Sequence, residues 1–414
     1  MNRAFYNGIS GVKSQQFGID TWGNNISNIS TNGFKANIPQ FAELFNDKLA
    51  QISNTGPVQS DQGFGARAHS SAISMKQGSV VQTERKLDVA IMGDGWFGVT
   101  NGEEGVAYTR NGNFASDKNG DLVNSDGAFL IGTLSPNLQD GKLADVSNFI
   151  PLAAATEQTT MRMPDDLILG SVATKNVVIH GNLGVEGVTG KFSTHIFMPN
   201  GEKGSIKIRI EKDENQPAQG SSWTLIAQLK NQAGETLFES DPGEIVFGAN
   251  GGLVKFDKPK IDNDGVNIDL KIDNMVTLAG NFIGKGIDAD GLPQGKLIDY
   301  HIDRDGHVVA NFDNGRASAV GKIALFHFQN DQGLTKMGDN LFAQSSNSGE
   351  AFFFKDALGR PSAGTDLLPH ALEKANVSTA EALTQLIVMQ KAFDASAKSI
   401  TTGDQLLQTA LKML

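Results

Sequence analysis

Three glycines have the spacing of a dinucleotide-binding loop: Gly93, Gly95 and Gly98 follow the apolar segment 87–91. That fingerprint binds a pyrophosphate only where a helix begins at the third glycine, because the free amides of the first helical turn then face the phosphates. Residues 99–102 have the sequence Val-Thr-Asn-Gly, which predicts the end of a strand and a turn. The spacing therefore indicates a tight β connection and no nucleotide cofactor.

A second glycine run, Gly184, Gly187 and Gly190 followed by Lys191, is similar to a phosphate-binding loop. Its spacing is wrong by one residue. Phe192 also stands where a Ser or Thr hydroxyl would be needed to bind the metal of a nucleotide. We interpret this run as a flexible loop.

Three Asp-x-Asp-Gly runs, at residues 262–265, 288–291 and 303–306, suggest calcium loops. A calcium loop of the helix-loop-helix type needs Gly at its sixth position and Glu at its twelfth. Counted from Asp288, these positions hold Pro293 and Asp299, and the other two runs fail similarly. Acidic β-turns are the better interpretation.

The residue types of catalytic and metal sites are present without the arrangement that such sites require. There is no cysteine, which excludes disulfides, thiolate zinc sites and thiol nucleophiles. No Gly-x-Ser-x-Gly nucleophile motif occurs, and no pair among the many carboxylates stands out as acid and base. The histidines show no metal-ligand spacing; they are His69, His180, His195, His301, His307, His327 and His370. The sequence therefore predicts no enzyme, no cofactor and no metal.

Composition limits the classes of partner. A chain of 414 residues is long enough for two or three domains, and 47 Gly against 3 Trp and 3 Tyr indicates a middle rich in strands and turns. A net charge of −11 argues against nucleic acid as the main partner. No apolar run reaches the roughly 20 residues of a membrane span, and the first residues lack the apolar core of a secretory signal.

The last stretch of the chain has a sustained heptad pattern. One seven-residue row is wholly apolar: Leu386, Phe393, Ile400, Leu407 and Leu414. The companion row is Leu383, Gln390, Ala397, Asp404 and Leu411. Although Gly403 costs roughly 1 kcal/mol relative to Ala, the pattern resumes beyond it. We therefore expect one long helix that lies against another helix.

The other helix is expected at the start of the chain. Its rows are Phe5, Val12, Ile19 and Ile26, with Ile9, Gln16 and Gly23 beside them. The helix should end near residues 23–25, since Gly and Asn tolerate the left-handed conformation of helix ends. The two termini thus predict a coiled-coil pair, and the polar residues in its seams can specify register. The alternative is two ordinary core helices of one globular domain.

Between the helices, Asn-Gly and Asp-Gly turns separate alternating segments, as in β-hairpins. We expect a multidomain α+β fold, with N- and C-terminal helices paired as a coiled coil and nested all-β domains between them. The expected division is 1–30 with 372–414 for the helical domain, 31–69 for an irregular connector with a short helix near Phe41, 70–145 with 285–365 for an inner β domain, and 146–284 for an inserted outer β domain.

Several motifs together resemble a known family. Residues 23–28 and 33–36 are similar to the N-terminal signature of the axial proteins of the bacterial flagellum, which include rod, hook and hook-associated subunits. Residues 87–91, 95–97 and 108–114 resemble the first β domain of the hook and distal-rod branch. Residues 372–377 and 389–393 resemble the family's C-terminal helix, although Arg and Tyr are more usual than Lys391 and Phe393. The connector motif comprises Gly23, Asn24, Asn25, Asn28, Gly33, Phe34 and Lys35.

The resemblance implies a structural role outside the cell. Identical subunits would stack into a curved helical tube that joins rod to filament and transmits torque as a universal joint. The implied partners are the distal rod, the hook cap and the proteins of the hook–filament junction, without nucleic acid or membrane insertion. Export would use the flagellar secretion apparatus. The length favours the hook branch, because distal-rod subunits lack the inserted middle domain.

Two alternatives remain at this stage: another flagellar axial subunit and, more remotely, a secreted β-rich carbohydrate-binding protein. An axial subunit should polymerise, whereas a binding protein should stay monomeric and hold a ligand. We also hypothesise that residues 23–36 order only on assembly.

Overall fold

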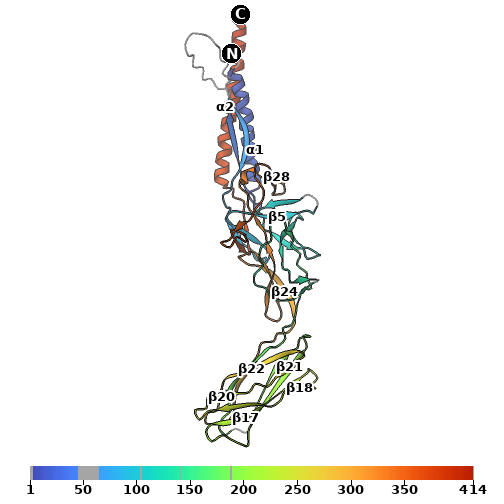
Figure 1. The fold of residues 1–414 in the computed structure, drawn as a ribbon. Coiled ribbons are helices and arrows are strands. Elements are labelled where there is room, and N and C mark those ends of the chain that lie inside the picture. The colour runs from blue at the N-terminus through green and yellow to red at the C-terminus, as the bar shows by residue number, and fades with distance from the viewer. Residues whose placement is uncertain (1–2, 45–64, 103–104, 140, 187–188, 414) are drawn as a thin grey trace.

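The computed structural model describes residues 3–44, 65–102, 105–139, 141–186 and 189–413. The molecule is elongated and has three parts (Figure 1). A helix pair with both chain ends lies at one extremity, a β-rich body (residues 66–171 and 293–373) lies in the middle, and an outer domain (residues 172–292) lies at the far extremity. No helix among these described residues has the length and apolar character needed to cross a membrane.

The two helices are α1 (Arg3–Ser27) and α2 (Thr379–Lys412). They run antiparallel, since Phe5 lies near Gly403 whereas Gly18 lies against Met389. The α2 helix continues through Gly403 as one helix, as the heptads predicted. The predicted fold class is therefore confirmed: the terminal helices pair and flank β-sheet regions.

The first helix extends two residues beyond the predicted stop at 23–25. Side chains of the last turn bond back to carbonyls four residues earlier: the Ser27 hydroxyl donates to the Gly23 carbonyl and the Asn28 amide to the Asn24 carbonyl. The Asn24 carbonyl also accepts from the Asn28 main-chain amide at 3.2 Å, so the side-chain bonds reinforce the last turn of the helix.

The segment predicted as an irregular connector contains two strands, β1 (Asn37–Glu43) and β2 (Ala66–Ile73), paired antiparallel. This corrects the prediction for residues 37–43 and 66–69, and Phe41 lies on a strand instead of a short helix. The alternating burial of Asn37, Ile38 and Pro39 is the half-buried strand pattern that the connector interpretation overlooked. Residues 45–64 of the expected connector lie outside the described residues.

The body is built from short strands around one main core. They are β3 (Val80–Gln82), β4 (Val89–Met92), β5 (Trp96–Thr100), β6 (Val106–Thr109), β7 (Phe114–Ser116), β8 (Leu122–Asn124), β9 (Phe129–Leu134), β10 (Leu138–Gln139), β11 (Lys142–Leu143), β12 (Thr159–Thr160), β13 (Ile168–Leu169), β24 (Gly295–Ile302), β25 (His307–Phe312), β26 (Ala317–Ile323), β27 (Leu325–Phe326), β28 (Thr335–Gly338), β29 (Leu341–Ala343), β30 (Phe354–Lys355), β31 (Pro361–Ser362), β32 (Asp366–Pro369) and β33 (Ala371–Glu373), with a short 3-10 helix η1 (Asp331–Gly333). Strands from both halves of the chain alternate, because β26 pairs with β9 and β29 pairs with β6.

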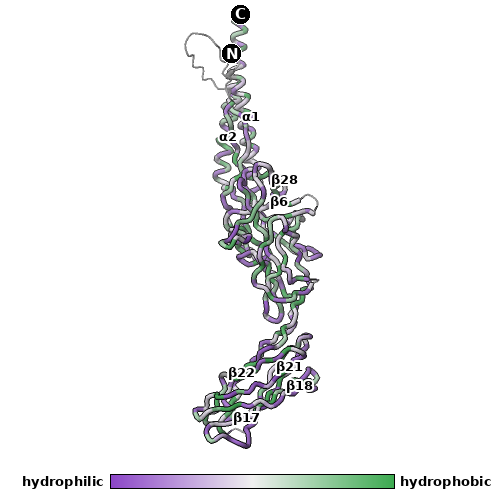
Figure 2. The backbone as a smooth tube through the Cα atoms, viewed as in Figure 1, coloured by the Kyte–Doolittle hydropathy of each residue, from purple (hydrophilic) through white to green (hydrophobic). Residues whose placement is uncertain are grey.

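The outer domain is a sandwich of two sheets. Its strands are β14 (Asn176–Asn182), β15 (Thr189–Phe197), β16 (Lys203–Lys212), β17 (Ser221–Lys230), β18 (Thr236–Glu239), β19 (Gly243–Phe247), β20 (Leu253–Phe256), β21 (Ile261–Asn263), β22 (Val266–Val276) and β23 (Ile283–Ala289). One sheet has the order β15-β16-β17-β19-β20 and the other the order β21-β22-β14-β23. Hydrophobic and hydrophilic residues alternate along these strands (Figure 2), so each sheet contributes one apolar face to a shared core around Trp223.

The packing divides body from outer domain at positions other than the expected 146 and 284. Met161, Met163 and Leu167 are fully buried in the body core, although few residues between 146 and 170 are in strands. Conversely, β23 pairs with β14 inside the outer domain. The chain passes between the two parts where the backbones of Val172 and Leu292 hydrogen-bond to each other at 2.9 and 3.0 Å.

Candidate functional site at the junction of the two chain ends

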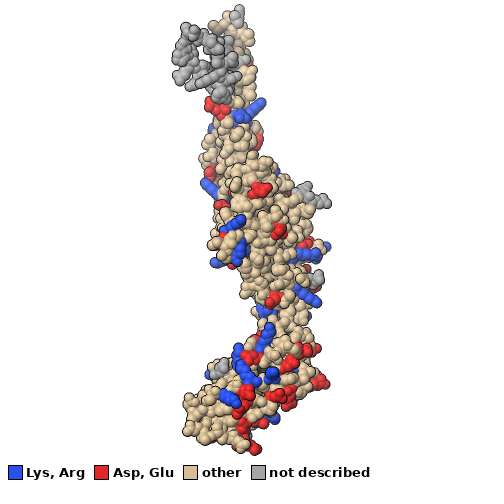
Figure 3. Space-filling model, in the orientation of Figure 1, with Lys and Arg blue, Asp and Glu red and all other residues tan. Residues whose placement is uncertain are grey.

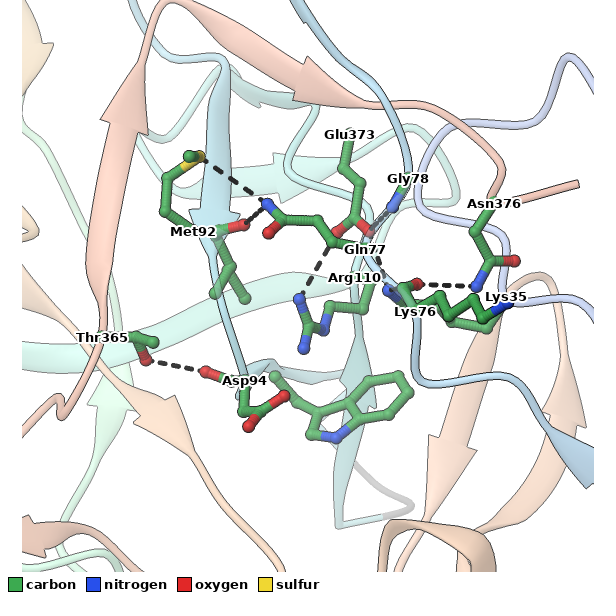
Figure 4. Close-up of polar contacts among 12 residues, drawn as sticks. Lys35, Lys76, Gln77, Gly78, Met92, Asp94, Arg110, Thr365, Glu373 and Asn376 are labelled. Carbon is green, nitrogen blue, oxygen red and sulfur yellow. Dashed lines mark hydrogen bonds and ion pairs between the residues drawn. The ribbon is translucent and has the colours of Figure 1, made fainter.

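The segment that follows α1 and the segment that precedes α2 meet at a buried ionic cluster (Figure 4). Lys35 comes from the connector motif, Arg110 follows β6, and Glu373 ends β33. The Lys35 Nζ lies 2.8 Å from Glu373 Oε1, and the Arg110 guanidinium lies 3.4 Å from Glu373 Oε2. All three side chains are only 1% exposed. We call this cluster and the backbone around it the terminal junction.

The carboxylate of Glu373 and the ammonium of Lys35 also bind backbone. Gly78 donates its amide to Glu373 Oε1 at 2.8 Å, and Lys35 donates to the Lys76 carbonyl at 3.0 Å. Because a buried charge is costly unless it is paired and hydrogen-bonded, these contacts make the cluster tolerable inside the protein. They also connect residues 76–78 to the segment after α1 and to the segment before α2.

Electrostatically, two cations share one buried carboxylate. Burial lowers the pKa of Lys35, the charge of Arg110 lowers it further, and Glu373 opposes both. Burial likewise lowers the pKa of Arg110 against the attraction of Glu373. Arg110 also lies over the Trp96 ring, 5.5 Å from its centroid, and so gains a cation–π contact. The cluster therefore depends on every partner being in place.

Two asparagine side chains hold the backbone beside the cluster. Asn25 accepts from the Asn37 amide at 2.9 Å and donates to the Asn37 carbonyl at 2.7 Å, as a neighbouring strand would. Asn376 accepts from the Ala36 amide at 2.7 Å and donates to the carbonyls of residues 74 and 76. The end of α1, the connector and the C-terminal segment are thus joined by paired amides.

Glycine is required at two close approaches in the junction. Gly33 has φ +68° and donates its amide to the Glu373 carbonyl at 2.7 Å. A Cβ at Gly33 would lie 2.5 Å from the Arg110 backbone, and one at Gly78 would lie 1.9 Å from the Lys374 carbonyl oxygen. Neither position accepts a side chain without moving the main chain.

The connector motif is closely packed, although its residues 28–36 form turns and no helix or strand. Asn25, Gly33, Phe34 and Lys35 are buried, Gly23 and Asn28 are half-buried, and Asn24 is exposed. Whether residues 23–36 order only on assembly stays a prediction. Sequence reasoning named Lys35 but missed Arg110, Glu373 and Asn376 as site residues. The only local signal was a charged pair, Glu373 and Lys374, between apolar Leu372 and Ala375.

On the helix pair, glycines and small residues face the partner helix. A Cβ at Gly8 would lie 2.7 Å from the Ile400 side chain, and one at Gly11 would lie 2.6 Å from Ser396 Oγ. The buried residues of α1 are Gly8, Ser14, Gly18, Trp22 and Asn25. Ile400 and Phe5, two residues of the predicted apolar rows, therefore lie at this contact, Ile400 against Gly8 and Phe5 near Gly403.

The predicted row residues are therefore only partly covered within one chain. Half-buried are Phe5, Ile9, Val12, Ile19, Ile26, Leu386, Phe393, Ile400 and Leu407. Leu383 is 45% exposed and Leu411 is 73% exposed, whereas Leu414 lies outside the described residues. Ile387, Val388 and Leu406 on α2 are also exposed, as is Met413 directly after it. The helix pair thus presents apolar surface that its own chain does not cover.

The motifs that suggested other chemistry have structural explanations. Gly93 and Gly95 have positive φ in the turn before β5, and a strand follows, as expected. Asp303 accepts from the amides of residues 305 and 307, and Asp262 accepts from Gly265, so both are acidic turns. Gly190 and Lys191 lie on β15 instead of in the loop expected there, and Gly187 lies outside the described residues.

In comparison with known proteins, three segments of the chain each match a family model. Residues 5–35 match "Flagella basal body rod protein", residues 90–167 match "Flagellar hook protein FlgE/F/G D1 domain", and residues 368–413 match "Flagellar basal body rod FlgEFG protein C-terminal". The first and third of these segments contain Lys35 and Glu373, and the second contains Arg110.

Curated relatives are similar over their whole length. The flagellar hook protein FlgE of Borreliella burgdorferi is 30% identical and is covered over 100% of both chains. FlgE of Escherichia coli is 29% identical over 99% of this chain and 100% of that protein, and FlgE of Brucella suis is 28% identical over 98% and 97%. A crystal structure of Helicobacter pylori FlgE2 covers 69% of this chain and 98% of its own, with 16% identity and a TM-score of 0.49.

Proposed function

This chain belongs to the flagellar hook protein family, and on that premise we propose that its terminal helix pair is the surface by which identical copies join into a curved tube. It is a structural subunit of the flagellar hook and not an enzyme. The family resemblance is confirmed by near full-length matches to hook proteins, and these favour the hook subunit over the distal-rod alternative.

The observation that carries the proposal is the exposed apolar surface of α2. Leu383, Ile387 and Leu411 are large apolar side chains that the chain leaves in solvent along one helix. Burying such side chains against a neighbour contributes about 1.5–3 kcal/mol each relative to exposure. Because exposed apolar side chains recur along a helix of 34 residues, they favour a continuous contact with helices of other copies.

The antiparallel pair suits this role because its glycine contact is narrow. Gly8, Gly11 and Gly18 lie toward α2, whereas Leu383, Ile387 and Leu411 on α2 are exposed and available to other copies. We propose that the helix pairs form the inner layer of the tube and that the body and outer domain lie further out. The terminal junction would then transmit torque from the helical layer to the β domains, as a universal joint requires.

The finer partners follow from the same premise. We propose that the ends of the tube contact the distal rod, the hook cap and the hook–filament junction proteins, and that export uses the flagellar secretion apparatus. The division into a helical domain, an inner β domain and an inserted outer β domain is retained, with the outer boundary moved to Val172 and Leu292.

The test is polymerisation of purified protein, followed by sedimentation at rising concentration and electron microscopy of the pellet. Leu383→Gln with Ile387→Gln should keep the protein in the supernatant, as should removal of residues 383–414. Leu358→Gln with Val254→Gln is the matched control, because both side chains are similarly exposed but lie outside the helices. Equal sedimentation of both double variants and the unmodified chain would refute the helix-mediated contact.

A further inference from the structure

A polar pocket of about 410 Å³ lies in the body, away from the helices and the terminal junction. It is formed by Phe149, by the turn between β24 and β25, by Lys322 on β26 and by residues 362–366. Its volume falls within the roughly 300–1,000 Å³ of small-molecule sites. The proposed assembly function does not use it.

Two buried polar side chains line the pocket. Lys322 is 8% exposed and forms no direct hydrogen bond with a described residue, although the carboxylates of Asp305 and Asp303 attract its charge. It lies 5.2 Å from the centroid of the Phe149 ring. His307 is 2% exposed, and its buried Nε2 has no hydrogen-bond partner among the described residues. A buried ring nitrogen without a hydrogen-bond partner is unfavourable, so a ligand group that bonds to His307 Nε2 is favoured here.

The hydrogen-bonding needs of the two groups are opposite. His307 Nδ1 lies 3.2 Å from a carboxylate oxygen of Asp303, so Nδ1 carries the proton that this oxygen accepts and Nε2 is left as an acceptor. Lys322 can only donate. Because His307 and Lys322 are register partners on neighbouring strands, one group can reach both. A hydroxyl accepts from Lys322 while it donates to His307.

The rest of the lining excludes an anion and favours more hydroxyls. Asp305 and Asp366 are exposed carboxylates of the pocket, and they would repel a ligand carboxylate or phosphate but accept from hydroxyls. Phe149 is 56% exposed and supplies an apolar aromatic wall, against which the C–H face of a ring can lie. We propose that this pocket binds a neutral sugar ring that lies against Phe149. One sugar hydroxyl accepts a hydrogen bond from Lys322 and donates one to His307.

The experiment titrates full-length protein, at concentrations where it remains monomeric, with glucose, galactose and N-acetylglucosamine, observed by saturation-transfer NMR of the sugar protons. Glycerol is the control probe, because it has hydroxyls but no ring. Phe149→Leu and Lys322→Met are the test variants. Phe41→Leu and Lys207→Met are the matched controls, because they make the same substitutions at exposed positions outside the pocket.

At least one of the three sugars should saturate, and glycerol should not. The test variants should weaken that affinity about tenfold, which corresponds to loss of one charged hydrogen bond or ring contact, and the control variants should leave it unchanged. Phe149 is largely exposed, so Phe149→Leu remains informative if Lys322→Met folds poorly. No saturable signal from any of the three sugars, an equal response to glycerol, or equal affinity in all variants would overturn the proposal.

Discussion

Lys35 and Glu373 lie 338 residues apart in the chain, and their charged atoms are 2.8 Å apart in a site that water does not reach. Lys35 follows the first helix and Glu373 precedes the last, so this contact joins the segment after α1 to the segment before α2. The charged surface elsewhere is different, because most Lys, Arg, Asp and Glu side chains project into solvent, most densely on the outer domain (Figure 3).

Glu373→Gln should destabilise the body strongly. The substitution leaves Lys35 and Arg110 buried as cations without a carboxylate, and breaking a buried pair in this way costs about 3–5 kcal/mol. Hydrogen exchange of β3 and β33 amides in the monomer should report the loss, since these strands pair at Glu373. Glu244→Gln is the matched control, because its partner Lys255 is exposed and such pairs contribute about 0–1 kcal/mol. Similar effects of the two substitutions would contradict the assigned role.

Gly8→Ala should weaken the helix pair. The added methyl would lie 2.7 Å from Ile400 and 3.1 Å from the Ser396 carbonyl oxygen, so α2 must move away. Gly23→Ala is the control in the same helix, since nothing lies within 4 Å of its new methyl. Gly23→Ala should be neutral or stabilise by up to about 1 kcal/mol through helix propensity. Thermal loss of helical circular dichroism would compare them, and an unchanged midpoint for Gly8→Ala would argue against a close glycine contact.

The stability of the body should fall at alkaline pH because of Tyr108. Burial raises the pKa of the Tyr108 phenol from its ordinary value of 10 to about 12. Below pH 10 the phenol is protonated in both states and gives no pH dependence. Between pH 10 and about 12 only the unfolded chain loses the proton, so the free energy of unfolding falls by about 1.4 kcal/mol per pH unit.

Urea unfolding at pH 10 and 11 would measure this slope. Burial also raises the pKa of Tyr300, so Tyr108→Phe should reduce the slope without abolishing it. Tyr6→Phe serves as control, because Tyr6 is exposed on α1. A slope unchanged by Tyr108→Phe would show that the Tyr108 phenol ionises equally in both states.

The helices could be predicted from sequence because heptad spacing is a local property of the chain. The contact between them could not, since the pattern of large apolar residues does not show that Gly8 and Gly18 permit a closer approach than Val12 or Ile19. The sequence therefore identified the apolar residues but not the face that each presents.

The terminal junction was predicted even less completely. Gly33 and Lys35 were recognised only as parts of a family motif. Arg110 and Glu373 lie in two other motif segments, 108–114 and 372–377, and were not singled out there. Pairing across hundreds of residues depends on the tertiary fold, and a charged residue carries no periodic signal that names its partner. Local rules favoured an Asn- and Gly-rich loop. Instead, the Asn25 side chain hydrogen-bonds to backbone 12 residues away, and the Asn376 side chain to backbone 302 residues away.

The outer domain should fold on its own as residues 172–292. Its core around Trp223 is built only from residues inside that range. The two segments that connect it to the body meet at the hydrogen-bonded pair Val172 and Leu292. A fragment cut at the expected boundaries, 146–284, would add buried body residues such as Met161 without their partners and remove most of β23. Trp223 is fully buried, so its fluorescence should show a cooperative urea transition for fragment 172–292. Fragment 146–284 should aggregate or unfold at lower urea, because β23 supplies the strand beside β14. If the longer cut proved the more stable of the two, the outer core would have to depend on residues that pack in the body.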